Sequence, residues 1–225
     1  MTTTPATDGR RTAAAARRRA REQEIIKATR ALFDERGVRD AQIEDVAKAV
    51  GINRAIIYRH FSGKEELFAL TMVGYLDELD QVLAESANKK TPSDQLRAVI
   101  ESFVDFGLQY PAFIDCAQTL MRRPGPELLE EVSESALFRL GRGIANCMEH
   151  IIRPLQAGKA SGEFKVKDPV LLANTLYSTG LGGLQLARLG LLVRSAAPGI
   201  PEVVPLSPDQ VKKYLVAAAV SLATT

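Results

Sequence analysis

The segment from residue 43 to residue 67 constrains the fold of this chain more than any other segment does. Its first half carries Ile43, Val46 and Val50 at helical spacing, which predicts one apolar face over about two turns. Gly51 follows directly, and a glycine ends a helix at little cost because it accepts a left-handed backbone. The segment therefore predicts a short amphipathic helix that ends in a tight turn.

A second short helix is predicted immediately after this turn. Asn53 is a favourable N-cap residue, and Ile56, Ile57 and Phe61 supply an apolar side. Two short helices joined by a glycine-containing turn form a helix-turn-helix, and the second helix of that motif enters the major groove of DNA. On spacing alone, an ordinary pair of amphipathic helices is an equally good interpretation.

Particular residues favour the DNA-binding interpretation. The chain resembles the DNA-binding domain of the TetR family of bacterial repressors at Gly51-Ile52-Asn53, Tyr58, His60-Phe61, Lys64-Glu65 and Leu67. It is also similar to the first helix of that family at Ile25, Ala28, Leu32-Phe33 and Gly37. The resemblance covers about residues 21–70 and departs from the family at Gln42, Asn53, Ala55-Ile56 and Gly63. It implies an all-α fold, with an N-terminal three-helix DNA-binding domain and a C-terminal helical domain for ligand binding and dimerisation.

Helical periodicity continues along the rest of the chain, where Trp is absent and strand-like alternation is scarce. We expect about nine helices in all, at residues 17–36, 43–50, 53–60, 64–87, 92–109, 111–122, 127–157, 168–189 and 207–222. Residues 190–206 are rich in Pro and Gly and predict a loop. The predicted domains are a disordered basic arm (residues 1–16), a helix-turn-helix domain (17–63) and a ligand-binding and dimerisation domain (64–225).

Charge is distributed unevenly between these parts. Residues 1–64 contain 14 Lys and Arg against 8 Asp and Glu, a net charge of +6, whereas residues 65–225 contain 15 against 19, a net charge of −4. A basic end suggests contact with a polyanion. It includes a run of arginines at Arg10, Arg11, Arg17, Arg18, Arg19 and Arg21. Three interpretations of this run stay open: a solvated tail, an arm that contacts DNA, and an organelle transit peptide that the rest of the chain does not support.

Cysteine usage and hydropathy favour a cytoplasmic protein. The two cysteines, Cys116 and Cys147, lie far apart and do not suggest a disulfide framework. No apolar run approaches the roughly 18 to 20 uncharged residues that span a bilayer. A secretory signal would need an apolar segment that the N-terminal region lacks.

The second helix of the motif supplies most of the candidate DNA contacts. Arg54 or Arg59 is expected to bind a guanine edge in bidentate fashion. Tyr58 and His60 resemble the phosphate-contacting pair of the family, and Lys64 is placed to bind a further phosphate. Packing at a helix end is the alternative for His60. A role as a metal ligand is disfavoured, because no cysteine or carboxylate lies at a useful interval from it. The predicted DNA-binding residues are Gln42, Asn53, Arg54, Ala55, Tyr58, Arg59, His60, Lys64, Arg17 and Arg18.

The later helices carry aromatic and methionine side chains that suit an apolar ligand, although each one individually is as well explained by a packed core. The predicted ligand-binding residues are Met72, Tyr75, Leu79, Phe103, Phe106, Tyr110, Phe113, Gln118, Met121, Phe138, Asn146 and Met148. The resemblance further implies a homodimer through the helices at about residues 168–190 and 207–222, and hence a palindromic DNA target.

The favoured function is a ligand-responsive transcriptional regulator. We expect a repressor that binds a palindromic operator as a homodimer and is released by a small, mostly apolar effector. The sequence does not distinguish repression from activation. A non-specific binder of DNA or of an anionic surface, acting through the basic arm, is the second hypothesis. An enzyme is the third and least favoured, because the chain has two histidines, no glycine-rich phosphate loop and no metal-ligand cluster. No cofactor and no metal site are expected.

Overall fold

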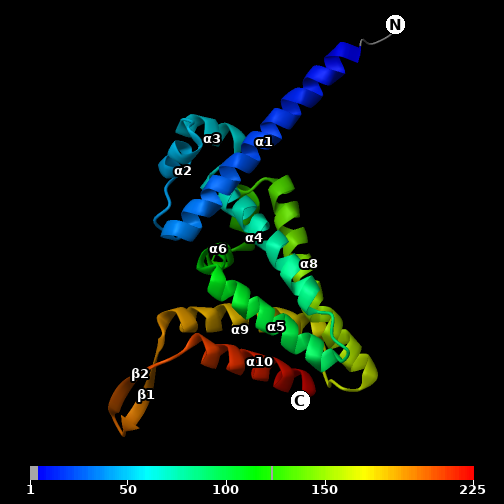
Figure 1. Ribbon diagram of the computed structural model, residues 1–225, viewed down its shortest axis with the longest axis vertical. Helices are drawn as coiled ribbons and strands as arrows, with labels where there is room; N and C mark the ends of the chain where they lie inside the picture. The colour runs from blue at the N-terminus through cyan, green and yellow to red at the C-terminus, as the bar shows by residue number, and fades with distance from the viewer. Residues whose placement is uncertain (1–4, 123) are drawn as a thin grey trace.

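The computed structural model describes residues 5–122 and 124–225, without the side chains of residues 5–11, 125 and 128. The described residues form ten helices and one two-stranded antiparallel sheet, which confirms the all-α class. Three helices, α1 (Pro5–Arg36), α2 (Ile43–Val50) and α3 (Arg54–His60), pack together at one end (Figure 1). The fourth, α4 (Lys64–Ser86), leads from this end into the body.

The body contains the remaining elements. In chain order they are α5 (Pro92–Gln109), α6 (Pro111–Met121), α7 (Gly125–Glu131), α8 (Glu134–Ser161), α9 (Pro169–Leu189), β1 (Leu191–Ala197), β2 (Ile200–Pro205) and α10 (Pro208–Thr224). Helix α4 packs along α8, α5 packs against α8 and α10, and α10 packs against α9. One continuous cluster of buried side chains runs from α1 through α4 to α10, so the DNA-binding end and the body share a core. None of the described helices combines the length and apolarity that crossing a bilayer requires.

Local signals position the helix ends. Gly51 adopts the left-handed backbone, with φ 72°, and its N–H donates to carbonyls at the end of α2. Thr91 caps α5 by accepting a hydrogen bond from the Asp94 N–H at 3.1 Å, and Asp168 caps α9 in the same way. A proline occupies the first turn of both helices, where its missing N–H costs nothing.

The structure differs from the sequence prediction at three places. Helix α1 begins at Pro5, so residues 5–16 are helical and not a disordered arm, while residues 1–4 lie outside the described part. The run Ala13–Ala16, with arginines on both sides, has high helix propensity and accounts for the extension. The prediction of one helix over residues 127–157 is wrong, because the chain breaks between α7 and α8, where Ser133 becomes the N-cap of α8.

The third difference is the hairpin formed by β1 and β2, in place of the loop predicted for residues 190–206. Leu191-Leu192-Val193 and Val203-Val204 are short runs that favour strands, and Gly199 takes φ 78° at the turn between them. The prolines in β2 suit a strand that has neighbours on one side only.

Candidate DNA interface and effector site

Helix α3 is a short helix anchored on one side and open on the other. Ile57 is 1% exposed and Phe61 is buried, so these side chains attach the helix to the core beneath it. The Asn53 side chain caps its first turn by accepting from the Ile56 N–H at 3.1 Å. The outward face consists of four predicted DNA-binding residues, all of them exposed: Arg54, Ala55, Tyr58 and Arg59.

Arg54 contacts two neighbouring side chains. Its Nη1 lies 2.6 Å from the Glu44 Oε1 of α2, and its guanidinium lies 5.3 Å from the centre of the Tyr58 ring. Both Arg54 and Glu44 are well exposed, so this ion pair contributes little and opens readily. Arg59 makes no ion pair within the described part of the chain and is available to an incoming phosphate or base.

A hollow of about 410 Å³ separates α3 from α1 and from the start of α8, and it is lined by Arg18, Tyr58, Arg59 and His60 among others. The His60 side chain is 15% exposed, and its Nδ1 lies 3.5 Å from the Glu22 Oε1 without a hydrogen bond. Arg18 Nε donates to the same Glu22 oxygen at 3.0 Å. Four of the predicted DNA-binding residues are thus brought to one hollow beside the outward face of α3.

The other predicted DNA-binding residues surround this face. Gln42 and Asn53 are exposed at the N-terminal ends of α2 and α3, and Arg17 is exposed on α1. Lys64 begins α4 and is half-buried, with its Nζ 5.0 Å from the centre of the Phe68 ring. All ten candidates lie at the α1–α3 end of the molecule, although Lys64 is partly occupied by an aromatic neighbour.

Sequence reasoning missed a carboxylate that joins this end to the body. Glu66 is 7% exposed, and its Oε2 accepts a hydrogen bond from the Ser62 N–H at 2.5 Å. Its Oε1 accepts from the hydroxyl of Ser133, the N-cap residue of α8. Burial raises the pKa of the Glu66 carboxyl, but the hydrogen bonds from Ser133 and Ser62 outweigh this effect and hold the pKa below its ordinary value. The local sequence shows no sign of this role, because a glutamate in the first turn of a helix is usually solvated.

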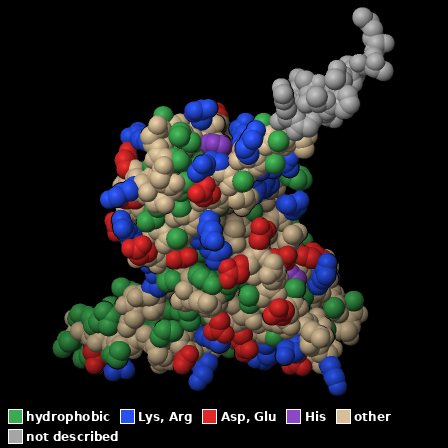
Figure 2. Space-filling view, turned by 45° about the horizontal axis from the view of Figure 1, so that its top comes forward, with side chains coloured by type: hydrophobic (Ala, Val, Ile, Leu, Met, Phe, Trp, Pro, Cys, Tyr) green, Lys and Arg blue, Asp and Glu red, His purple; other side chains and the backbone are tan. Residues whose placement is uncertain are grey.

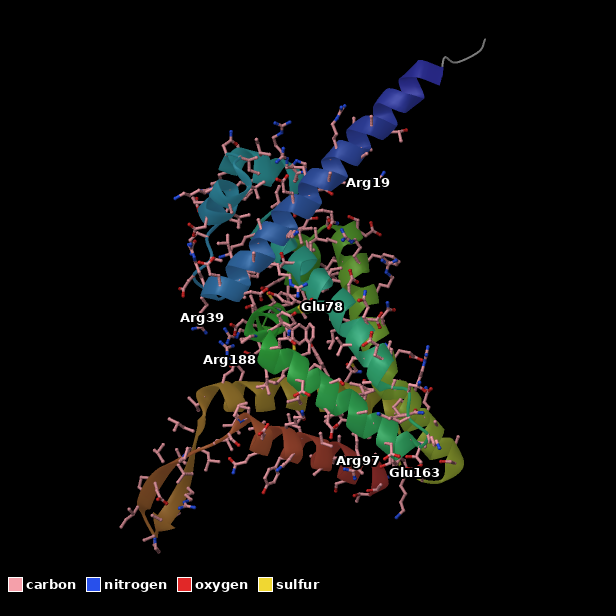
Figure 3. The ribbon with its side chains drawn as sticks, viewed as in Figure 1. Arg19, Arg39, Glu78, Arg97, Glu163 and Arg188 are labelled. Atoms are coloured by element: carbon pink, nitrogen blue, oxygen red, sulfur yellow. The ribbon has the colours of Figure 1, made fainter. Side chains whose placement is uncertain are left out.

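A second polar link joins α1 to α4 and to the junction of α5 and α6. Arg30 forms an ion pair with Glu78, labelled in Figure 3, and Tyr110 Oη donates to Glu78 Oε1 at 2.7 Å. Tyr75 Oη donates to Asp34 Oδ1 at 2.6 Å, and the Arg30 guanidinium lies 4.2 Å from the centre of the Tyr75 ring. Tyr75 and Tyr110 were predicted to bind a ligand, but both hydroxyls donate to carboxylates of the protein itself.

Most of the predicted ligand-binding residues are packed against one another. Phe103, Phe106 and Phe113 form edge-on contacts, with ring centres 5.4 to 6.2 Å apart, and Tyr75 and Tyr110 adjoin them. Met72 and Leu79 are 2% and 1% exposed. This aromatic cluster fills the space between α4, α5 and α6, which matches the packed-core interpretation of these side chains.

An apolar cavity lies beside the cluster, between α4, α5, α8 and α9. It is lined by Leu76, Leu79, Leu83, Phe103, Ile144, Cys147, Met148, Ile151 and Tyr177. Its volume is about 20 Å³, which suffices for one water molecule, whereas pockets for small ligands measure roughly 300 to 1,000 Å³. Three of the predicted ligand-binding residues, Leu79, Phe103 and Met148, line this cavity, which must expand before it can hold an effector.

Three of the predicted ligand-binding residues point outward and do not line an interior pocket. Met121 is 55% exposed at the end of α6, Phe138 is 69% exposed on α8, and Asn146 is exposed on α8. The inward stripe of α8 is formed at helical spacing by Ala136, Leu140, Gly143, Cys147 and Ile151. Phe138 and Asn146 lie out of phase with that stripe.

Gln118 was predicted as a ligand residue and lies in a different, polar cleft. Its Oε1 accepts a hydrogen bond from Gln185 Nε2 at 2.8 Å. The cleft measures about 460 Å³ and separates the chain after α1 from the ends of α6 and α9. Arg39 and Arg188, both labelled in Figure 3, line it from opposite sides. Arg188 is already paired with Asp115 at 2.7 Å, so the cleft is not a simple cationic site.

Comparisons with known proteins agree with this geometry. The family model for bacterial regulatory proteins of the tetR family matches residues 25–71. The transcriptional activator FasR of Mycolicibacterium smegmatis is 32% identical over 87 residues, which are 38% of this chain and 40% of FasR. The transcriptional repressor KstR2 of Rhodococcus jostii is 29% identical over 153 residues, which are 68% of this chain and 72% of KstR2. These relatives are named as transcription regulators and not as enzymes, in line with the sequence prediction.

The fold of the whole chain also has counterparts. The crystal structure of FadR from Bacillus subtilis in complex with stearoyl-CoA superposes with a TM-score of 0.63 at 16% identity, over 89% of this chain and 98% of that chain. The sequence matches are shorter: the chain spans 40%, 60% and 63% of the length of the first three curated relatives. The family model thus matches the segment that contains the outward-facing α3, and the whole chain shares its fold with a crystal structure titled as a bacterial regulatory protein in the tetR family.

Proposed function

We propose that the protein is a ligand-responsive transcription regulator, that residues 17–63 form its DNA-binding domain, and that residues 64–225 bind an effector and a second copy of the chain. The observation that carries the proposal is α3, a short helix whose Ile57 is fixed in the core while Arg54, Tyr58 and Arg59 face solvent. A helix presented in this way fits a major groove. Such a regulator acts in the cytoplasm, where the DNA is.

We assign recognition of the DNA sequence to Arg54 and Arg59. Contacts that position the protein on the DNA backbone are assigned to Tyr58, His60, Lys64 and the arginines of α1. Arginine can bind both acceptors of a guanine edge, whereas contacts to phosphate hold the protein in register without distinguishing sequences. Because the chain carries one such helix, a palindromic operator requires two copies related by a two-fold axis.

The surface for the second copy is proposed on α9 and α10. Large apolar side chains are exposed there at Val170, Leu171, Leu186, Leu189, Tyr214 and Leu222. A row of this kind on the last helices is typical of a surface that another protein covers. A homodimer through residues 168–190 and 207–222 would bury it and place two α3 helices on one face.

The effector is proposed to be small and mostly apolar, and to enter between α4 and α8. The lining side chains of the cavity are almost entirely apolar, and the solved relative FadR is titled as a complex with stearoyl-CoA. Since the cavity is nearly closed in this state, an effector binds only a state in which α8 has moved away from α4. That unequal affinity for two states is what a ligand needs to change DNA binding.

The first experiment tests DNA recognition. We expect the wild-type protein to shift DNA from the region upstream of its own gene in an electrophoretic assay. Arg54→Ala should relax its sequence preference in competition with mismatched sites, whereas Arg142→Ala, an exposed arginine on α8, should leave the preference unchanged. The absence of any shifted species at low salt would refute the proposal. Repression and activation are then separated by transcription from the same promoter in the presence and absence of the protein.

The second experiment tests the effector cavity with a fluorescent fatty acid, parinaric acid, as the probe. Met148→Trp fills the cavity and should abolish saturable binding. Phe138→Trp adds an indole to the outer face of the same helix and should not affect it. Equal binding to both variants would place the effector elsewhere.

The non-specific binder is separated from this proposal by removing residues 1–16. If that deletion abolishes all DNA binding while Tyr58→Ala retains it, binding depends on the arginine run and not on α3.

A further inference from the structure

The hairpin of β1 and β2 projects away from the helical body, at the lower left of Figure 1. Its two strands contact each other and the end of α9, and among the described residues any other packing on the body is slight. A two-stranded hairpin by itself is at best marginally stable in water. The hairpin therefore needs a surface to pack against, and its own chain supplies almost none.

The two faces of the hairpin differ in character. Side chains alternate between the faces along each strand. On one face Arg194 lies directly opposite Glu202, and its Nε donates to the carboxylate at 2.7 Å. On the other face Val193 lies directly opposite Val203, with Leu191 beside them. This second face carries no charged side chain.

Both faces contact solvent, and the apolar face is the more exposed of the two. Leu191, Val193 and Val203 are 44%, 68% and 61% exposed. Figure 2 shows hydrophobic side chains gathered over this projection. Antiparallel sheets with one wet face normally place polar residues on it. The arrangement here is the reverse, which is typical of a face that another molecule covers.

We propose that the hairpin is an arm that clasps a second copy of this chain, with its apolar face packed on helices α9 and α10 of that copy. The inference rests on the homodimer of the proposed function and extends its interface. The apolar surface is continuous along the chain, because Leu186 and Leu189 on the last turn of α9, 42% and 65% exposed, lead directly into Leu191 and Val193.

A second copy fits this surface better than another partner does. A two-fold interface needs both a surface and its complement on one chain, and this chain carries the projecting apolar hairpin together with an exposed apolar row on α9 and α10. Residues 191–205 contain one Arg and one Glu, so their net charge is zero and offers no attraction for nucleic acid or anionic lipid. Two-fold symmetry also makes the contact twice, once by each arm.

The test is the dissociation constant of the dimer, measured by sedimentation over a range of protein concentration. The double variant Val193→Lys, Val203→Lys places two charges on the apolar face and should weaken the dimer roughly 100-fold or more, since charge in a buried interface core is strongly unfavourable. The matched control Gln156→Lys, Ala157→Lys adds the same charge at exposed positions of α8 and should leave the dimer unchanged. Thermal melting of the monomeric fraction should be unaltered, because the hairpin hardly contacts its own body.

Two further variants distinguish a failure of the proposed arm from a failure of the proposed homodimer. Replacing residues 192–204 by a short Gly-Ser turn should weaken the dimer as the lysine pair does, without any added charge. Leu171→Lys on α9 tests the homodimer itself. If Leu171→Lys dissociates the dimer while both hairpin variants leave it intact, the arm is refuted and the proposed function stands. A wild-type chain that stays monomeric at every concentration refutes both, and hairpin-dependent binding to phosphatidylcholine vesicles with an unchanged dimer also overturns the arm.

Discussion

Replacing Glu66 by glutamine should destabilise the protein measurably, although it changes a single non-hydrogen atom. The carboxylate accepts hydrogen bonds from the Ser62 N–H and the Ser133 hydroxyl in a site that is 7% exposed. Hydrogen bonds to a charged group contribute about 1.5 to 3 kcal/mol, and those between neutral groups about 0.5 to 1.5. Two such bonds lose roughly 1 kcal/mol each in Glu66→Gln, so we expect the free energy of unfolding to fall by about 2 kcal/mol. At 2 to 4 °C per kcal/mol for a chain of this size, Tm falls by roughly 4 to 8 °C.

The pH dependence of this difference identifies its cause. The hydrogen bonds hold the pKa of the Glu66 carboxyl below its ordinary value, despite burial, which acts in the opposite direction. A carboxyl whose pKa is lower in the folded state contributes its stability above the unfolded pKa, and that contribution is lost as the pH falls through the folded pKa. The free energy of unfolding of the wild type should therefore exceed that of Glu66→Gln by the full amount at about pH 7, and by progressively less below about pH 4.

The assay is urea unfolding followed by far-ultraviolet circular dichroism, at a series of pH values. Glu101→Gln is the matched control, because Glu101 is exposed on α5 and the same substitution there should shift the unfolding free energy by less than about 0.5 kcal/mol. A loss below about 0.5 kcal/mol for Glu66→Gln at neutral pH would refute the reasoning. A loss that stays constant into the acid range would show that packing, and not the charge of Glu66, holds the two parts together.

Three other perturbations give expected results of different kinds. Glu44→Gln removes the carboxylate that holds Arg54 and repels phosphate, so DNA binding should tighten several-fold in a shift assay, and weaker binding would contradict this role. Gly158→Ala places a Cβ 2.1 Å from the Phe164 ring and should destabilise by about 1 to 3 kcal/mol, whereas Gly141→Ala in the same helix meets nothing within 4 Å and should stabilise by up to about 1 kcal/mol; thermal melting of both variants checks the contrast. Burial raises the pKa of both cysteine thiols, so Ellman's reagent should react with neither in the native protein and with both after unfolding in guanidinium; rapid native reaction would mean that the core opens.

The sequence predicted best those features that depend on neighbouring residues. The bounds of α2 and α5 agree with the structure because Gly51, Thr91 and Pro92 act within one turn of the helix ends they define. The outward direction of Arg54 and Tyr58 agrees with local periodicity, since Ile57 and Phe61, four residues apart, mark the buried side.

Features that depend on distant partners were missed. Phe138 is as apolar as the buried residues of α8, and packing of the other stripe of α8 against α4 leaves it facing outward. Glu66 gains its role from Ser133, 67 residues away, and that pairing leaves no mark on either local sequence. The hairpin was mistaken for a loop because Pro and Gly dominated the prediction for residues 190–206, although the paired valine runs favoured strands.

The two polar links and the cavity have a spatial order along α4 that bears on regulation. Glu66, near the start of α4, holds the N-cap of α8, and Glu78, three turns later, holds α1 and the α5–α6 junction. The apolar cavity lies alongside, between Leu76 and Leu83. In the proposed mechanism, an effector that separates α8 from α4 at the cavity also strains the hydrogen bond between Ser133 and Glu66, and Glu66 accepts from the Ser62 N–H just after α3. We propose that Glu66 is one connection between expansion of the cavity and movement of α3, so Glu66→Gln should weaken the effect of an effector on DNA binding as well as lower Tm.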